Sequence, residues 1–342
     1  MAGIRYPRPL VPGARVEVPA PSSGVPESLH ARLDRAVEEL AGRGLDVRVG
    51  ELARRGGLVP GTVEERVAEL HAAFAARPGA VLPPWGGDLA VELVDRLDWS
   101  AMADAGAWFV GWSDLSTLTL PLTVTTGLAT LHGANLMDEP WELPEEFLRW
   151  TDVAALAEGS SFTQRAAPFR RSRPWGEWQD EPLSRGASYE APTRWRALDG
   201  RTEVRASGRL IGGCLETVSL LAGSPWGDVP GFARRHAPEG LVVHLEVSGA
   251  DAATALRLWT SLRLAGWFDA ANAVLVGRTT APDVDGLTQE DAVRRALGDL
   301  GVPVVLDVDT GHQPPQLPLV DGALAEVVLD ADGGSITQRL VP

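Results

Sequence analysis

The chain of 342 residues contains no lysine: all 31 of its basic residues are arginine, against 46 acidic residues, and its formal net charge is −15. Since a nucleic-acid groove needs a basic face to neutralise phosphates, this acidic balance argues against a nucleic-acid partner. The single cysteine, Cys214, excludes a disulfide framework and any zinc or iron–sulfur site built from several thiolates. No two of the six histidines lie three or four residues apart, so we expect no metal site.

Long apolar runs are absent as well. The first apolar stretch, Val16 to Ala20, is far too short to span or anchor in a membrane, and Met1 to Pro12 has no apolar core of signal-peptide length. We therefore expect a cytoplasmic protein without a membrane partner. The chain also has no G-x-G-x-x-G after its first predicted strand and no Walker A glycine loop, which argues against a nucleotide cofactor.

The composition is typical of a globular α/β protein. Hydrophobic residues make up 44% of the chain and charged residues 23%, close to the globular average. At roughly 150 residues per domain, the length predicts two domains. In the first half, strand patterns alternate with amphipathic helical patterns: strands within 13–23, 45–49, 80–82 and 108–110, helices within 29–40 and 62–74. Such alternation predicts a parallel sheet that binds ligands at the carboxyl ends of its strands.

The regular pattern breaks between residues 161 and 199, where Pro, Arg and Trp are frequent and no periodicity is visible. A connection of this length is either functional or a linker. Regular pattern resumes near Gly208, with helical stretches between apolar runs at 241–243, 273–276 and 302–306. We therefore predict an N-terminal domain over 1–160, a connection over 161–199 and a second α/β domain over 200–342.

Ser113 is the first candidate for chemistry. It lies in Gly111-Trp112-Ser113-Asp114, directly after the predicted strand at 108–110 and before a predicted helix. A serine at a sharp strand-to-helix turn has its hydroxyl lifted out of the backbone, near a helix N-terminus that favours developing negative charge. A serine at this place can also simply cap the helix. Taken alone, this short motif favours a role for Ser113 as a helix cap over a role as a nucleophile.

The turn Pro84-Trp85-Gly86-Gly87-Asp88 follows the predicted strand at 80–82. Two successive glycines allow close approach of a ligand to the backbone and leave amide donors free, as an oxyanion hole requires. The alternative is an ordinary tight turn.

A serine nucleophile needs a base, and His312 is the best placed of the six histidines. It follows the predicted strand at 302–306 in Asp309-Thr310-Gly311-His312, whereas surface, packing or hydrogen-bonded core roles are the simpler interpretation for the other five. Glu246 ends another predicted strand, where its carboxylate could hold the Nδ1–H of a histidine. An exposed acid at the strand end is the competing interpretation.

Taken in chain order, these segments resemble the LD-carboxypeptidase/microcin C immunity family of serine peptidases. The resemblance covers most of the chain and rests on six segments: 12–23, 64–87, 111–114, 208–213, 245–246 and 311–312. It implies a flavodoxin-like N-terminal domain, similar to class I glutamine amidotransferases, with a parallel sheet. It further implies a swivelling-type C-terminal α/β domain, with the active site between the two domains.

The same resemblance implies a Ser-His-Glu triad that works without a cofactor. Ser113 would be the nucleophile, His312 the general base and acid, and Glu246 the residue that orients His312. The backbone amides of Gly87 and Asp114 would form the oxyanion hole. The implied reaction is hydrolysis of an amide near a carboxylate through an acyl-enzyme, on a small peptide or a peptide-nucleotide, by a homodimer.

Substrate contacts are expected from Trp85, Gly86 and Trp178. The tryptophans of the 161–199 connection resemble the microcin-immunity branch of the family; they could stack on a nucleobase or simply pack the connection onto the domains. The chain departs from the family at Cys214, where asparagine is usual, and at Val247, where a second acid is frequent. Because fold does not guarantee chemistry, a non-catalytic protein that binds small molecules or peptides remains the alternative.

Overall fold

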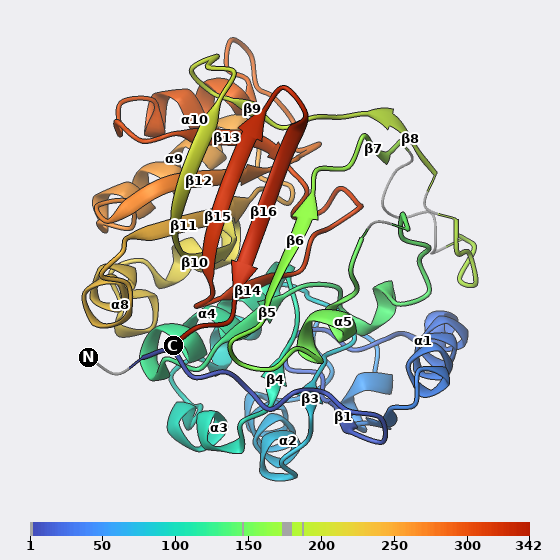
Figure 1. The fold of residues 1–342 in the computed structure, drawn as a ribbon. Coiled ribbons are helices and arrows are strands. Elements are labelled where there is room, and N and C mark those ends of the chain that lie inside the picture. Colours follow the sequence, from blue (N-terminus) through green and yellow to red (C-terminus); the bar gives the residue numbers. More distant parts are fainter. Residues whose placement is uncertain (1–2, 146, 173–179, 187) are drawn as a thin grey trace.

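The structure is a computed structural model, and it describes residues 3–145, 147–172, 180–186 and 188–342. It is a two-domain α/β fold, with the N-terminal half below and the C-terminal half above in Figure 1. Each half is built on its own main sheet, and the fold class predicted above is confirmed.

The N-terminal sheet is parallel, with the strand order β2-β1-β3-β4. Its strands are β1 (Arg15–Val18), β2 (Asp46–Val49), β3 (Ala80–Val81) and β4 (Trp108–Phe109). The next strand, β5 (Thr130–His132), continues this order, because Leu131 forms a parallel bridge with Val110 beyond the end of β4. This is the strand order of the flavodoxin-like fold.

The helices of this domain begin and end at local sequence signals. The main ones are α1 (His30–Gly42), α2 (Val63–Ala75), α3 (Trp99–Ala105), α4 (Ser116–Thr126) and α5 (Trp150–Ala154). Thr62 and Glu65 form the predicted capping box at the start of α2. Gly106 and Gly127 end α3 and α4 in left-handed conformations that cost a residue with a Cβ more than they cost glycine.

The C-terminal domain is built on an eight-stranded mixed sheet with the order β6-β16-β15-β10-β11-β12-β13-β9. Its parallel centre consists of β10 (Val204–Cys214), β11 (Leu241–Glu246), β12 (Ala271–Gly277) and β13 (Val304–Val308). The helices that follow or connect these strands are α7 (Leu215–Val218), α8 (Val229–His236), α9 (Ala252–Leu264) and α10 (Gln289–Leu297).

The flanks of this sheet are antiparallel, unlike the parallel strands predicted from the alternating pattern. β15 (Leu324–Asp330) and β16 (Gly333–Arg339) form a hairpin in which Asp330 pairs with Gly333, and β15 pairs with β10. In both strands buried residues alternate with less buried ones, as expected for a sheet with one covered face. This hairpin lies at the front of Figure 1, in red.

Short strands from the 161–199 connection complete the sheet at both ends. β6 (Ser161–Arg165) pairs with β16 at one edge, and β9 (Arg196–Ala197) pairs with β13 at the other. Between them, β7 (Phe169–Arg171) and β8 (Tyr189–Pro192) form a separate antiparallel pair. The connection therefore contributes to the C-terminal sheet as well as linking the halves.

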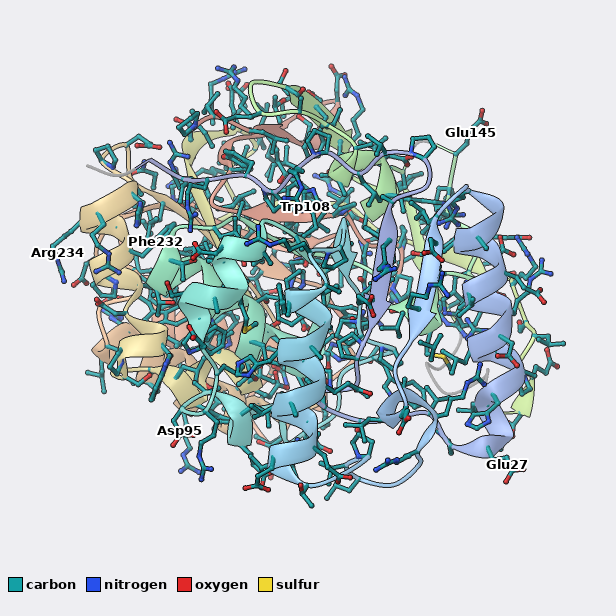
Figure 2. All side chains as sticks on the ribbon, turned by 90° about the horizontal axis from the view of Figure 1, so that it is seen from below. Glu27, Asp95, Trp108, Glu145, Phe232 and Arg234 are labelled. Atoms are coloured by element: carbon teal, nitrogen blue, oxygen red, sulfur yellow. The ribbon has the colours of Figure 1, made fainter. Side chains whose placement is uncertain are left out.

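The two halves are joined by more than the connection. β14 (Leu319–Asp321), from the C-terminal half, pairs antiparallel with β5 of the N-terminal half. Figure 2 shows Trp108, which is fully buried, in the middle of the molecule, and charged side chains such as Glu27 and Arg234 at its rim. No helix within the described ranges has both the length and the apolar character needed to cross a membrane.

Candidate active site

Ser113 occupies a strained turn at the end of β4. It begins the 3₁₀ helix η4 (Ser113–Leu115), which leads into α4, and its φ of +62° lies in the left-handed region. Such a conformation costs a residue with a Cβ about 1–3 kcal/mol and is held by the surrounding structure. Two residues earlier, Gly111 makes room for Leu115, because a Cβ at Gly111 would lie 2.5 Å from Leu115 Cδ1. The side chain of Ser113 bonds to His312 rather than capping the helix.

His312 lies between Ser113 and Glu246. Its Nε2 is 3.2 Å from Ser113 Oγ, and its Nδ1 is 2.8 Å from Glu246 Oε2. Because the carboxylate accepts the Nδ1 proton, Nε2 is left as the acceptor for the serine hydroxyl. Gly311 permits this approach: with φ at +96°, a Cβ there would lie 2.6 Å from Glu246 Oε2.

Burial and neighbouring carboxylates set the pKa of His312. Glu246, the last residue of β11, is fully buried, so the competing interpretation of an exposed strand-end acid is wrong. Burial is the largest single effect and lowers the pKa of His312, but the charge and hydrogen bond of Glu246, together with the charges of Glu216 and Asp138, outweigh it. The net result is a His312 pKa above its ordinary value, because the imidazolium is stabilised.

A second hydroxyl, which was not predicted from the sequence, also reaches His312. Ser248 Oγ lies 3.0 Å from His312 Nε2. Its loop is held by Glu216, whose Oε1 accepts the backbone N–H groups of Ser248, Gly249 and Ala250, each at 2.9 Å. Nothing in the local sequence marks this contact, since it depends on α7 and the loop after β11 meeting in space.

The glycine turn packs directly on the turn that holds Ser113. A Cβ at Gly86 would lie 2.9 Å from Ser113 Cβ and 3.0 Å from the Asp114 amide nitrogen. Gly87 has a φ of +152°, and a Cβ there would lie 2.3 Å from Ser23 Oγ. Neither the Gly87 amide nor the Asp114 amide donates to an acceptor within the described part of the chain. Both are therefore available to a substrate oxygen.

The side chain of Asp114 has a structural task. Its Oδ2 accepts the Ser22 hydroxyl at 2.6 Å and the Ala90 amide at 2.8 Å, which ties three loops together beneath the turn. Burial raises the pKa of Asp114, and these hydrogen bonds oppose that rise. The carboxylate thus fixes the position of the backbone amide that the family resemblance implies for the oxyanion hole.

These residues open onto a cleft of about 580 Å³. Its lining includes Ser113 and His312, both glycines of the turn, and Trp85, Trp112 and Asp138. The Trp112 ring lies against His312, with ring centroids 4.3 Å apart, and its Nε1 donates to Asp138 at 2.9 Å. Trp85 donates its Nε1 proton to Gly24 O at 3.1 Å. Trp178, predicted to contact substrate, lies outside the described residues.

The structure thus brings together every predicted site residue that it describes: Trp85, Gly86, Gly87, Ser113, Asp114, Glu246 and His312. Trp195 packs elsewhere: it is 1% exposed and donates to Asp309 Oδ2 at 2.7 Å. For this tryptophan, the packing interpretation is confirmed.

Cys214 lies beneath the site. It is 1% exposed, and its Sγ is 3.4 Å from Glu216 Oε2. Burial, followed by the nearby Glu246 and Glu216 carboxylates, raises its pKa well above the ordinary value. The thiol is therefore protonated at neutral pH and unsuited to act as a nucleophile. Val247, the other departure from the family pattern, is also buried.

Two of the other histidines, His244 and His132, make contacts that support a structural role. His244 is fully buried in β11 and bonds to Asp321 at 2.8 Å. His132 packs its ring against His244, with centroids 5.2 Å apart. Within the described ranges, no group of three or more His, Cys, Asp or Glu residues is arranged to hold a metal ion.

Comparison with known proteins identifies both halves of the chain. Residues 16–133 match the model described as the LD-carboxypeptidase N-terminal domain, and residues 207–327 match the LD-carboxypeptidase C-terminal domain. "Putative carboxypeptidase SCO6489" of Streptomyces coelicolor is 33% identical, over 98% of this chain and 97% of its own. The Microcin C7 self-immunity protein MccF of Escherichia coli is 25% identical, over 93% and 92%.

The fold is also similar to solved structures. The structure of MccF in complex with aspartyl sulfamoyl adenosine superposes with a TM-score of 0.79, at 22% identity, over 99% of this chain and 100% of that chain. This similarity establishes the fold.

Proposed function

The chain belongs to the LD-carboxypeptidase family, and from this premise we propose that it is a serine hydrolase that cleaves an amide bond through an acyl-enzyme on Ser113. One observation carries the proposal: the continuous contact from Ser113 Oγ through His312 to the buried carboxylate of Glu246. Nucleophile and base are within reach of each other, and a third group orients the base, as nucleophilic catalysis requires.

The proposed reaction has two halves. Ser113 Oγ attacks the carbonyl carbon of the amide and passes its proton to His312 Nε2, while Glu246 stabilises the imidazolium. The carbonyl oxygen becomes an oxyanion that accepts hydrogen bonds from the amides of Gly87 and Asp114. His312 then gives the proton to the leaving amine as the C–N bond breaks. Water, deprotonated by His312, releases the acid and restores Ser113.

Ser113 is a better candidate for the nucleophile than Ser248, although both hydroxyls reach His312. Ser113 lies at the start of a helical segment, in a left-handed conformation, and its Cβ packs against Gly86 in the turn that holds the Gly87 amide. An oxyanion formed at Ser113 therefore has donors beside it. Ser248 belongs to a loop whose amides are already bonded to Glu216.

The proposed substrate is either a muropeptide with an LD-linkage or an aminoacyl-nucleotide of the microcin type, with the cleaved amide near a carboxylate. The first follows from the family and the second from the relative MccF, which has been solved with aspartyl sulfamoyl adenosine. Trp85 and Trp112 give the cleft aromatic faces on which a nucleobase could stack. Homodimer formation stays a prediction, which light scattering of the purified protein tests.

A fluorophosphonate probe tests the nucleophile without knowledge of the substrate. The serine oxygen displaces fluoride and forms a stable bond to phosphorus, and mass spectrometry of the digested protein locates the adduct. We expect the adduct on Ser113, no labelling of Ser113→Ala, and labelling of the matched variant Ser248→Ala. An adduct on Ser248 that survives Ser113→Ala would contradict the assignment.

Parallel assays with an LD-tetrapeptide and an aminoacyl sulfamoyl adenosine test the substrate. Cleavage of one or both, abolished in Ser113→Ala, supports the hydrolase. Cleavage of the tetrapeptide alone rules out the aminoacyl-nucleotide. If the protein binds either compound but cleaves neither and takes up no probe, the non-catalytic binding protein is the better description.

A further inference from the structure

Asp138 is an acidic group in the cleft that the proposed reaction leaves unused. It ends the short 3₁₀ helix η5 (Leu136–Asp138) and lines the same cleft as Ser113 and His312. Its Oδ2 accepts the Trp112 indole N–H at 2.9 Å and the Asn135 amide at 3.1 Å. Its Oδ1 takes no hydrogen bond from any residue that the structure describes.

The carboxylate is poorly solvated and lacks a countercharge in direct contact within the described part of the chain. Burial raises the pKa of Asp138 to about 6, against the opposing effects of its hydrogen bond from Trp112 and the charge of Arg32. Arg32 is nearby but engaged with backbone carbonyls, donating to Met137 O at 2.8 Å and to the carbonyls of Pro182 and Ser184. At neutral pH, Asp138 is therefore mostly ionised in a place that favours a cation beside it.

The rest of the cleft points to the same class of ligand. Among its described lining residues, Asp138 and His312 alone carry ionisable side chains, and none is arginine. Trp85 and Trp112 add aromatic faces, which attract cations. A second carboxylate on the substrate would find no arginine in this lining, whereas an ammonium would find a carboxylate and aromatic rings.

The position of Asp138 relates this charge to the reacting atoms. Trp112 precedes the nucleophile in the chain, lies against His312 and donates to Asp138, so a single indole connects the carboxylate with the catalytic turn. Because Ser113, His312 and Asp138 line one cleft, a group bound there by the Asp138 carboxylate would belong to the part of the substrate near the cleaved carbonyl.

We propose that Asp138 binds an ammonium group on the residue that acylates Ser113, so that the preferred substrate is an amide whose acyl residue carries a free amine. This rests on the proposed function. The amine can come from two sources: the α-amine of an aminoacyl-nucleotide, or the side-chain amine of a diamino acid in a muropeptide. The recognition chemistry is the same for both.

Two pairs of substrates test this subsite and separate the sources. One pair is an aminoacyl sulfamoyl adenosine with its α-amine free or acetylated. The other is an LD-tetrapeptide ending in L-lysyl-D-alanine, with the side-chain amine free or acetylated. For the pair whose amine reaches Asp138, we expect acetylation to lower kcat/KM of the wild type about 10- to 100-fold, mainly through KM, as for loss of a charge-assisted hydrogen bond.

Asp138→Asn is the decisive variant, because an asparagine oxygen can still accept the Trp112 proton. We expect it to lose most of its preference for the free amine, measured as the ratio of kcat/KM for the free and the acetylated substrate, because any effect on the reacting groups is common to both substrates and cancels in this ratio. Asp95→Asn, at an exposed residue near the rim of Figure 2, is the matched control and should keep the wild-type preference.

The ways in which this proposal can fail are distinguishable. If the wild type cleaves these amides but is indifferent to acetylation in both pairs, the subsite is refuted and the hydrolase stands. Retention of the full preference by Asp138→Asn would also refute the subsite and leave the hydrolase intact. If the wild type cleaves none of the four substrates and the fluorophosphonate leaves Ser113 unlabelled, both the proposed function and the subsite are refuted. The wild-type comparison holds even if the variant fails to fold.

Discussion

Glu246→Gln removes one charge from the proposed triad and leaves its shape almost unchanged. Glu246 is fully buried, and its Oε2 accepts the Nδ1 proton of His312 at 2.8 Å. A glutamine that turns its amide N–H₂ toward Nδ1 makes that nitrogen the acceptor and puts the imidazole proton on Nε2. In that tautomer His312 cannot take the proton of Ser113.

The expected loss is large. For the corresponding change in a serine-protease triad the rate falls by about 10⁴, and at about 1.36 kcal/mol per tenfold this corresponds to roughly 5.4 kcal/mol of transition-state stabilisation. In this protein too, the acid is buried and lies within hydrogen-bond distance of the histidine: Glu246 is fully buried, and its Oε2 is 2.8 Å from His312 Nδ1. We therefore expect kcat/KM, or the second-order rate of fluorophosphonate labelling, to fall by about 10³–10⁴.

The pH profile should also change, in a direction that follows from the pKa. In the wild type, burial lowers the pKa of His312, but Glu246, with help from Glu216 and Asp138, raises it above its ordinary value, so activity is lost as pH falls through that raised pKa. Without the carboxylate, burial dominates and lowers the pKa of His312. The acid limb of the residual activity should therefore move to lower pH.

The assay is the labelling rate measured from acidic to mildly alkaline pH, with circular dichroism to confirm folding. Glu326→Gln, on the surface of β15, is the matched control and should behave like the wild type. A Glu246→Gln variant that is folded, reacts within tenfold of the wild-type rate and keeps its acid limb would refute the role of Glu246 as the partner of the base.

Four further predictions test other parts of the site and its support. Gly86→Ala should lower kcat/KM about 100-fold, because the new Cβ would lie 2.9 Å from Ser113 Cβ and 3.0 Å from the Asp114 nitrogen. The circular dichroism of this variant should stay close to that of the wild type. A fully active variant would show that the two turns need not be in contact. Ser248→Ala should cost no more than about tenfold in the labelling rate, as for one neutral hydrogen bond, and complete inactivation would mean that Ser248 does more than contact the base. Asp309→Ala should lower the free energy of unfolding in urea by about 3–5 kcal/mol, since it leaves the buried Arg278 without its counter-ion, and a loss below about 1 kcal/mol would contradict this. Cys214 should resist Ellman's reagent at mildly alkaline pH in the native protein and react after denaturation, because it is 1% exposed and its pKa is raised; rapid native reaction would show that the site opens.

Local patterns in the sequence determined much of the framework. The capping box at Thr62 and Glu65 and the strand before Ser113 could be recognised because such signals depend on neighbouring residues. The hairpin of β15 and β16 was missed, although its alternation and the short turn between Asp330 and Gly333 are local and readable. The antiparallel pairing of β15 with β10 is different, because no local pattern states which strand lies beside it.

The sequence by itself therefore determined which candidate catalytic side chains lie at the ends of strands. It also gave little support for a metal site or a thiol nucleophile. Tertiary structure alone decided which of them meet. Ser113 and His312 are 199 positions apart, and their contact exists because the two halves pack with the carboxyl ends of β4 and β13 facing one cleft. The left-handed turn of Ser113, the second hydroxyl from Ser248 and the unmatched carboxylate of Asp138 were invisible for the same reason. Each is set by contacts between distant segments, and such contacts leave no periodicity in the chain.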